Sequence, residues 1–187
     1  MALDASSTTI GICLLSYDDK KITLDYVSYY KPPKKGNIFE RLDVVRKYIQ
    51  TKIDELKPDA VTIEDIVLFM KNKSSANTIT TLAVVNRVIG LTVFDKIGKA
   101  PYLYNVMRVR HAIKKGKDLP SKQDVPELVA DILDVKFPYV KKNEKMVKEN
   151  EDMADAIAVG ICHIYMDRAG KADQLQIKKK KKKVKKK

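Results

Sequence analysis

The sequence predicts an α/β domain on a mixed five-stranded sheet, with three antiparallel strands first, parallel strands after them, and flanking helices. Residues 2–31 contain several short runs of β-branched and aromatic residues, and polar turns separate these runs. From residue 38 onward, segments with apolar residues at helical spacing alternate with short buried runs. We expect one domain over residues 1–170, because this length and a hydrophobic fraction of 44% suffice for a single core.

The first thirty residues are expected to form the antiparallel part of the sheet. The first strand begins at residue 2, and residues 9–15 form a second strand because they are short, apolar and β-branched. Residues 21–30 alternate in polarity, which predicts that Ile22, Leu24 and Tyr26 share one side of a third strand.

Helices and strands alternate in the rest of the chain. Apolar spacing predicts a helix over residues 38–56, and a buried strand at residues 60–64 then needs a crossover and a parallel partner. The further expected elements are a helix over 75–96, a strand at 102–104, helices over 106–114, 121–133 and 151–167, and a polar, lysine-rich stretch over 141–150. This order is typical of the RNase H-like fold.

Basic charge is concentrated at the carboxyl end of the chain. The formal net charge is +13, but nine of the residues 178–187 are lysine, which leaves +4 for residues 1–177. We expect residues 171–187 to be a disordered tail that binds polyanions, because such a segment buries no apolar surface and repels itself. A nuclear-localisation signal and a solubility or cloning artefact are alternative interpretations.

Composition also bears on the compartment. Cys13 and Cys162 lie in apolar stretches without metal-like spacing, so we expect buried free thiols in a reducing environment. The first residues lack the pattern of a secretory signal. The apolar stretch 79–94 is interrupted by Asn86 and Arg87, which makes it too short and too polar for a membrane span. We expect an intracellular protein without membrane association, in cytoplasm or nucleoid for a bacterial or phage source, with nucleus or organelle left open.

Four acidic residues occupy positions that are awkward for a core and useful for a metal ion. Asp4 ends the first predicted strand, and Glu64 ends the buried strand. Asp152 and Asp155 open the last helix, where a spacing of three places their Cβ atoms ~5–6 Å apart on one face. Since this helix is rich in alanine and glycine as far as Gly160, it can lie close to the sheet and bring its first turn toward the strand ends.

Clustered carboxylates repel one another unless cations neutralise them, and hard oxygen ligands select Mg²⁺ or Mn²⁺. Two such ions about 4 Å apart can activate a water molecule and stabilise the leaving oxygen of a phosphodiester. Alternatively, Asp152 and Asp155 merely cap the helix and complement its dipole. The occurrence of four acids in this order on these elements favours the metal interpretation.

Three motifs in sequence order resemble those of a known nuclease family. They are Asp4-Ala5-Ser6 followed by Thr9-Ile10-Gly11, Ile63-Glu64 followed by a helix with Asn77 and Gly90, and Asp152-Met153-Ala154-Asp155-Ala156-Ile157-Ala158 with its Asp-x-x-Asp-Ala pattern. In these motifs the chain is similar to the RuvC-type Holliday junction resolvases, and the likeness extends to about Tyr165.

The resemblance implies a Mg²⁺-dependent DNA endonuclease, with Mn²⁺ as a substitute, that resolves four-way junctions by paired symmetric nicks. By this analogy Asp4, Glu64, Asp152 and Asp155 are the catalytic residues and hold two metal ions. The residues expected to contact DNA are Phe69, Lys71, Lys73, Arg108, Arg110, Lys114 and Lys122.

Some of these assignments have simpler alternatives. Phe69 either stacks on a base near the junction centre or makes an ordinary core contact, and Arg110 and Lys122 either approach the phosphate or are solvated surface charges. The resemblance also implies a homodimer through the helix at 75–96 and a branch-migration motor as a partner. A two-fold dimer suits two symmetric nicks.

Other functions remain open at this point. An RNA/DNA-hybrid nuclease would use the same fold, metals and acids, and a non-enzymatic nucleic-acid-binding module would lack the chemistry. An actin-like or sugar-kinase-like ATP-binding domain is suggested by the polar run 4–9, but the chain is short for two lobes. We expect His163 to be a packed helix residue and His111 to face the DNA.

Overall fold

The computed structural model describes residues 1–6, 8–66 and 76–172. The strands of its main sheet are β1 (Ala2–Ala5), β2 (Ile10–Tyr17), β3 (Ile22–Tyr30), β4 (Thr62–Asp65) and β5 (Tyr102–Asn105). The helices are α1 (Ile38–Leu56), α2 (Ala76–Ile97), α3 (Val106–Ile113), α4 (Val125–Leu133) and α5 (Glu149–Arg168). A 3₁₀ turn, η1 (Lys122–Asp124), precedes α4, and a small hairpin of β6 (Lys141–Lys142) and β7 (Lys145–Met146) precedes α5.

The main sheet has the strand order β3-β2-β1-β4-β5, which confirms the predicted mixed five-stranded sheet. β1 pairs with β2 and β2 with β3 in antiparallel fashion, whereas β1–β4 and β4–β5 are parallel. Leu3 lies opposite Ile63 in the parallel pair. Since parallel neighbours end at the same edge of a sheet, Asp4 and Glu64 reach that edge together.

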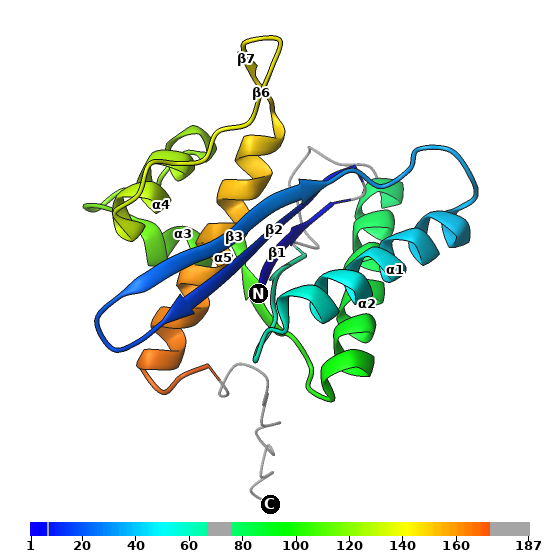
Figure 1. The fold of residues 1–187 in the computed structure, drawn as a ribbon, viewed down its shortest axis with the longest axis horizontal. Coiled ribbons are helices and arrows are strands. Elements are labelled where there is room, and N and C mark those ends of the chain that lie inside the picture. The colour runs from blue at the N-terminus through cyan, green and yellow to red at the C-terminus, as the bar shows by residue number, and fades with distance from the viewer. Residues whose placement is uncertain (7, 67–75, 173–187) are drawn as a thin grey trace, which may run out of the picture.

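Each face of the sheet carries its own apolar core, and Figure 1 shows helices on both sides. Helices α1 and α2 pack on one face, where Leu3 and Ile12 belong to their core. Helices α3, α4 and α5 cover the other face, where the neighbouring residues Ala2 and Cys13 point. This alternation follows from the two-residue period of a strand. It explains why these strands are apolar on both faces.

The expectation for the third strand was wrong in one respect. The pairing of β2 with β3 shifts between Leu14 and Leu15, so that Asp25 has no partner in the ladder. Because an extra residue moves every following side chain to the other face, Leu24 packs in the α5 core and Tyr26 in the α1 core. Local alternation does not reveal such a bulge.

Most other boundaries differ from the predictions by one or two residues, as in β2 and β4, and the start of α4 differs by more. The helix expected from residue 121 begins at Val125, because Ser121 and Asp124 cap each other across η1 and close a 3₁₀ turn first. The last helix begins at Glu149 instead of residue 151. The predicted tail at 171–187 lies outside the described residues from Asp173 onward, and its disorder stays a prediction.

Several smaller expectations can also be compared with the structure. Cys13 and Cys162 are buried and free, as predicted. His163 is buried and its Nδ1 lies 2.9 Å from the Tyr104 hydroxyl, which confirms it as a packed helix residue. The apolar stretch expected to be too short and too polar for a membrane span lies in α2, which is 22 residues long and does meet the length and composition criteria for a span. The core helices of soluble proteins meet the same criteria.

Candidate metal centre

The four acidic side chains singled out in the sequence line one cavity of about 320 Å³. Asp4 enters it from the end of β1 and Glu64 from the end of β4, while Asp152 and Asp155 enter from the first turns of α5. Three segments of the chain that are at least 60 positions apart therefore line the same cavity. The gathering expected from the strand ends and the helix start is present in the fold.

Two glycines allow α5 to come this close to the sheet. A Cβ atom on Gly11 of β2 would overlap the backbone carbonyl of Asp152. A Cβ atom on Gly160 would lie 2.6 Å from Leu15 Cδ1 and 3.2 Å from Ala2 Cβ. The absence of these atoms lets the first turn of α5 touch β2 beside the end of β1, which positions Asp152 next to the other acids.

Burial raises the pKa of all four carboxyl groups, and repulsion by other members of the cluster raises the pKa of Asp4, Glu64 and Asp152 further. Burial is the largest cause for Asp4, and the charges of Glu64, Asp155 and Asp152 raise its pKa further. The pKa of Glu64 rises to about 7, again mainly through burial and then through Asp155. Desolvation also raises the pKa of Asp152 and of Asp155. Such a cluster favours the uptake of protons or of a cation.

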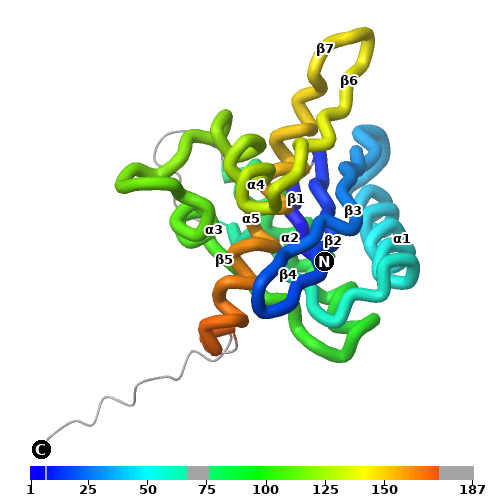
Figure 2. The backbone as a smooth tube through the Cα atoms, turned by 60° about the vertical axis from the view of Figure 1, so that its left-hand side comes forward, coloured from blue at the N-terminus to red at the C-terminus, as the bar shows by residue number. Residues whose placement is uncertain are grey.

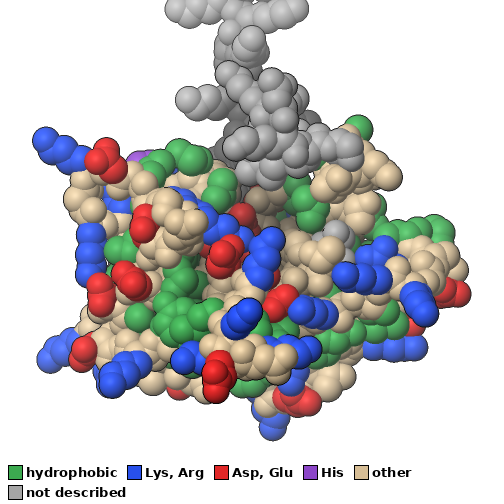
Figure 3. Space-filling model, turned by 90° about the horizontal axis from the view of Figure 1, so that it is seen from above, with side chains coloured by type: hydrophobic (Ala, Val, Ile, Leu, Met, Phe, Trp, Pro, Cys, Tyr) green, Lys and Arg blue, Asp and Glu red, His purple; other side chains and the backbone are tan. Residues whose placement is uncertain are grey.

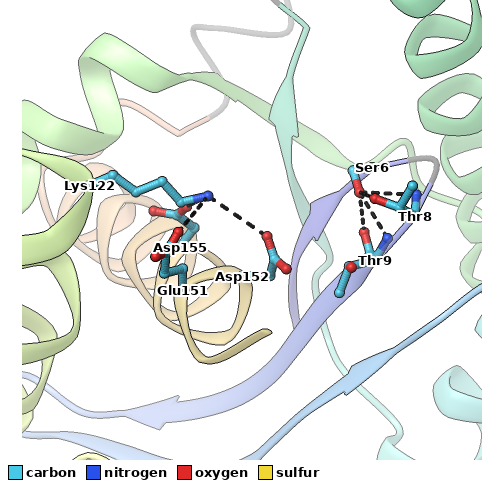
Figure 4. A network of polar contacts seen from close by, with 7 residues as sticks. All are labelled: Ser6, Thr8, Thr9, Lys122, Glu151, Asp152 and Asp155. Carbon is cyan, nitrogen blue, oxygen red and sulfur yellow. Dashed lines mark hydrogen bonds and ion pairs between the residues drawn. The ribbon is translucent and has the colours of Figure 1, made fainter. Parts of the chain in front are cut away.

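Lys122 supplies positive charge to this cluster in the structure. Its Nζ lies 3.3 Å from Asp155 Oδ2, 3.8 Å from Asp152 Oδ1 and 3.6 Å from Glu151 Oε2. Figure 4 shows the side chain reaching across the start of α5 toward these oxygens. The ammonium group lowers the pKa of both aspartates against the effect of burial. Lys122, expected at the DNA, thus contacts the acids themselves.

The chemistry of the side chains decides whether the cavity can hold a divalent cation. Within residues 1–6, 8–66 and 76–172, no three His, Cys, Asp or Glu side chains are arranged as a ready-made metal site. The Lys122 ammonium lies among the carboxylates instead. Four carboxylates without thiol or imidazole are the donors that suit Mg²⁺ or Mn²⁺. The charge that Lys122 partly neutralises in this structure is the charge that such an ion would neutralise.

The other basic residues predicted to contact DNA lie at different distances from the cavity. Arg110 of α3 lines it, donates to the Pro120 carbonyl at 2.6 Å and lowers the pKa of Glu64. Arg108 instead lies against Met166, with 3.6 Å between its Nη1 and the sulfur.

Lys114 donates to the Lys117 carbonyl at 3.4 Å and does not line the cavity. Phe69, Lys71 and Lys73 lie outside the described residues. Of the predicted contacts, therefore, the fold brings only Arg110 and Lys122 to the acids among the residues it describes. His111 is exposed on α3.

Asn86 of α2 is a site residue that the sequence reasoning missed. It is only 2% exposed, and its Nδ2 donates to the backbone carbonyl of Glu64 at 2.9 Å. Arg87 donates to Asn86 Oδ1 at 3.1 Å and lies 3.5 Å from Asp65. This chain of contacts fixes the end of β4. The sequence did contain a signal for this role, because Asn86 places an amide within an apolar helical stretch. From the sequence alone, Asn86 is interpreted only as an interruption of that stretch.

Ser6 orders the turn that follows Asp4. Its Oγ accepts from the Thr9 amide at 2.9 Å and donates to the Thr9 carbonyl at 2.7 Å. Figure 4 shows this turn beside Asp152, across the cavity from Lys122. The polar run 4–9 therefore holds the strand end that carries Asp4.

Comparison with known proteins gives a consistent result. The family described as "Crossover junction endodeoxyribonuclease RuvC" matches residues 1–163. A crossover junction endodeoxyribonuclease RuvC from Finegoldia magna is 28% identical over 167 residues, which cover 88% of this chain and 92% of that protein. One from Sulfurovum is 29% identical over 170 residues and covers 88% and 93%.

A similar solved structure is that of T. thermophilus RuvC in complex with a Holliday junction substrate. It superimposes with a TM-score of 0.70 at 19% identity and covers 91% of this chain and 95% of the other. At this identity the structural likeness supports the fold, and the family match over most of the chain carries the assignment. The chain therefore belongs to the crossover junction endodeoxyribonuclease RuvC family.

Proposed function

We propose that this protein is a divalent-metal-dependent endonuclease that cuts four-way DNA junctions by paired symmetric nicks. The observation that carries the proposal is the convergence of Asp4, Glu64, Asp152 and Asp155 in one cavity of a chain from this family. The complex of the T. thermophilus protein with its junction substrate supports the same substrate class. An intracellular site of action and a branch-migration motor as partner belong to this proposal.

In the proposed mechanism the four carboxylates hold two Mg²⁺ ions, or Mn²⁺ in their place. When bound, the ions supply an activated water and stabilise the leaving oxygen of the phosphodiester. Lys122, which contacts Asp152 and Asp155 in this structure, would offer its ammonium group to a phosphate oxygen of the substrate. Arg110 lies on the same wall and offers a second cationic contact to the DNA backbone. Asn86 holds the strand end that carries Glu64.

Asp4→Asn tests this assignment, because it removes one charged oxygen donor without changing the size of the side chain. We expect junction cleavage in Mg²⁺ to fall at least about a thousandfold, while the Kd for a labelled junction in EDTA stays within about twofold. Asp25→Asn, at the β-bulge, is the matched control and should cleave like wild type. A D4N protein that cuts at the wild-type rate would refute the proposed metal site.

The same assay separates the alternative functions. Wild type should cut the junction in Mg²⁺, remain inactive in EDTA, and leave an RNA/DNA hybrid largely intact. If the protein cuts the hybrid in preference to the junction, the RNA/DNA hybrid and not the junction is its substrate. Tight junction binding without cleavage in Mg²⁺ or Mn²⁺ would instead indicate a non-enzymatic binding module.

We also propose that α2 forms a homodimer interface, because two symmetric nicks need two active centres. Val84, Leu91 and Phe94 lie on one exposed face of α2, with Leu91 at 61% and Phe94 at 51% exposure. Leu91→Glu combined with Phe94→Glu should give a folded monomer that makes single, uncoordinated nicks. Light scattering measures the mass, and a supercoiled cruciform distinguishes one nick from two. A variant that stays dimeric contradicts this interface.

A further inference from the structure

The β6–β7 hairpin is an exposed basic projection within the stretch that the sequence predicted to be polar and lysine-rich. Residues 141–148 contain Lys141, Lys142, Lys145 and Lys148 against the single acid Glu144. All four lysines are exposed. Figures 1 and 2 show from two directions that the hairpin extends beyond the main sheet and the helices. It adds little to either core, so stability of the fold does not explain it.

The charges of the hairpin are arranged unfavourably for the hairpin itself. Lys142 lies directly opposite Lys145 in the register, across a two-residue turn in which Asn143 and Glu144 both have positive φ. Like charges facing each other across a strand pair are destabilising. Among the residues that the structure describes, no acid forms an ion pair with any of the four lysines. Their charge is therefore available to an external anion.

A buried amide fixes the base of the hairpin. Asn150 is only 4% exposed, and its side chain binds both backbone groups of Val140, accepting at 2.8 Å and donating at 2.9 Å. The Val147 amide also donates to the Val140 carbonyl at 3.2 Å. Since Asn150 lies in the first turn of α5, two residues before Asp152, the hairpin has a defined position relative to the acids. An anchor of this kind is unnecessary for a merely solvated loop.

Basic side chains lie on the end of the molecule that carries the hairpin, and the hairpin has the length of a short run of phosphates. Figure 3 views the molecule from the end that carries the hairpin, and Lys and Arg side chains are spread over this face with acidic ones between them. The three residues from Val140 to the turn at Asn143 extend about 10 Å, the length of roughly three base-pair steps along duplex DNA. A short stretch of duplex backbone can thus contact the hairpin along its length.

We propose that the β6–β7 hairpin is a phosphate-binding arm that holds a duplex arm of the substrate beside the candidate metal centre. This inference rests on the proposed function for its ligand, a DNA duplex, and adds a contact element to that site. The contacts are ionic and independent of sequence, because lysines at a backbone read charge and not bases. The arm acts in binding, and the reaction at the acids does not require it.

The test compares two pairs of lysines in hairpin turns. Lys142→Gln with Lys145→Gln removes two charges from the arm, and Lys20→Gln with Lys21→Gln removes two exposed charges from the β2–β3 turn at the other end of the sheet. The Kd for a four-way junction and for a plain 30-base-pair duplex is measured in EDTA at several salt concentrations. Single-turnover cleavage is measured with enzyme in excess, and thermal unfolding checks the fold.

If the arm binds DNA, the K142Q/K145Q protein has a salt slope of log K reduced by about 2 and a Kd weakened roughly tenfold to a hundredfold. Its cleavage rate at saturating enzyme stays within about threefold of wild type. The K20Q/K21Q protein matches wild type in all three measurements. If the two variants have equal affinities and equal salt slopes, the proposal that the hairpin binds DNA is overturned.

The outcome for the arm is independent of the outcome for the nuclease. Suppose that the wild-type protein cuts no junction, but the salt slope of its duplex binding depends on Lys142 and Lys145. This result supports the phosphate-binding arm and refutes the proposed function. If the wild-type protein cuts junctions and the two variants have identical salt slopes of binding, the nuclease function is supported and the proposal of a phosphate-binding arm is refuted.

Discussion

Helices α5 and α2 are both long and apolar, yet the fold buries them very differently. In α5 every residue from 153 to 164 is buried, whereas α2 buries only five residues and exposes Val84, Leu91 and Phe94. α2 has the more apolar sequence of the two. Apolar content therefore does not determine burial here. α5 lies between the sheet and the layer of α3 and α4, whereas α2 packs mainly on α1 and on the sheet among the residues that the structure describes.

The difference has a functional consequence. Close approach to the sheet lets α5 bring two acids to the strand ends, at the cost of crowding charges that repel one another. The exposed face of α2 leaves apolar surface for a second copy of the chain, as proposed above. One helix thus builds the site within a protomer, and the other is suited to join two sites.

The largest expected effect is at the contact between β2 and α5. Gly11→Ala adds a Cβ atom that overlaps the Asp152 carbonyl, so α5 must shift outward. We expect a loss of about 3 kcal/mol in the free energy of unfolding, measured in urea. Cleavage by the remaining folded protein should also fall at least about tenfold, because Asp152 moves from the other acids. Wild-type stability would contradict the close approach of α5.

A matched pair of glycines compares the two helices directly. Gly160→Ala in α5 meets Leu15 at 2.6 Å and should destabilise the protein by about 1 to 2 kcal/mol. Gly90→Ala in α2 meets only Pro101 at 3.6 Å and should stabilise the protein by up to about 1 kcal/mol, through better helix propensity. If both substitutions change the free energy of unfolding in urea in the same direction, the proposed difference in packing between α5 and α2 is contradicted.

The crowded acids predict a pH dependence of stability in EDTA. The folded pKa of Glu64 is raised from 4.5 to about 7, so the folded state keeps a proton that the unfolded state has lost between these values. Stability should therefore fall as pH rises through this window, by on the order of 2 kcal/mol, and level off above it. Mg²⁺ should raise the Tm at pH 8 more than at pH 5.

Glu64→Gln is the control for this dependence. It removes one titrating group from the cavity, so the decrease in Tm between pH 5 and pH 8 should become smaller in EDTA. The Mg²⁺-induced increase in Tm at pH 8 should also shrink. A variant with the full wild-type decrease would show that Glu64 does not carry the effect.

Local patterning was enough to predict the order of the five main-sheet strands and the helices, and it singled out the four acids by their positions at strand ends and a helix start. Strand alternation, helical spacing and the Asp-x-x-Asp-Ala motif at residues 152–156 depend only on near neighbours in the chain. The bulge at Asp25 and the tight turn of the β6–β7 hairpin escaped prediction. In both cases the sequence contains a polar residue that can adopt several backbone conformations. Pairing with another strand determines which of these conformations the residue adopts.

Packing between distant segments determined the details of the site. Lys122 and Asp155 are 33 residues apart, and their 3.3 Å contact exists because η1 and the first turns of α5 meet at the cavity. The same holds for Asn86, whose amide reaches the carbonyl of Glu64 only once α2 lies against β4. Burial then raised the pKa of the acids, which depends on the water excluded by the whole fold and not on any neighbouring residue in sequence.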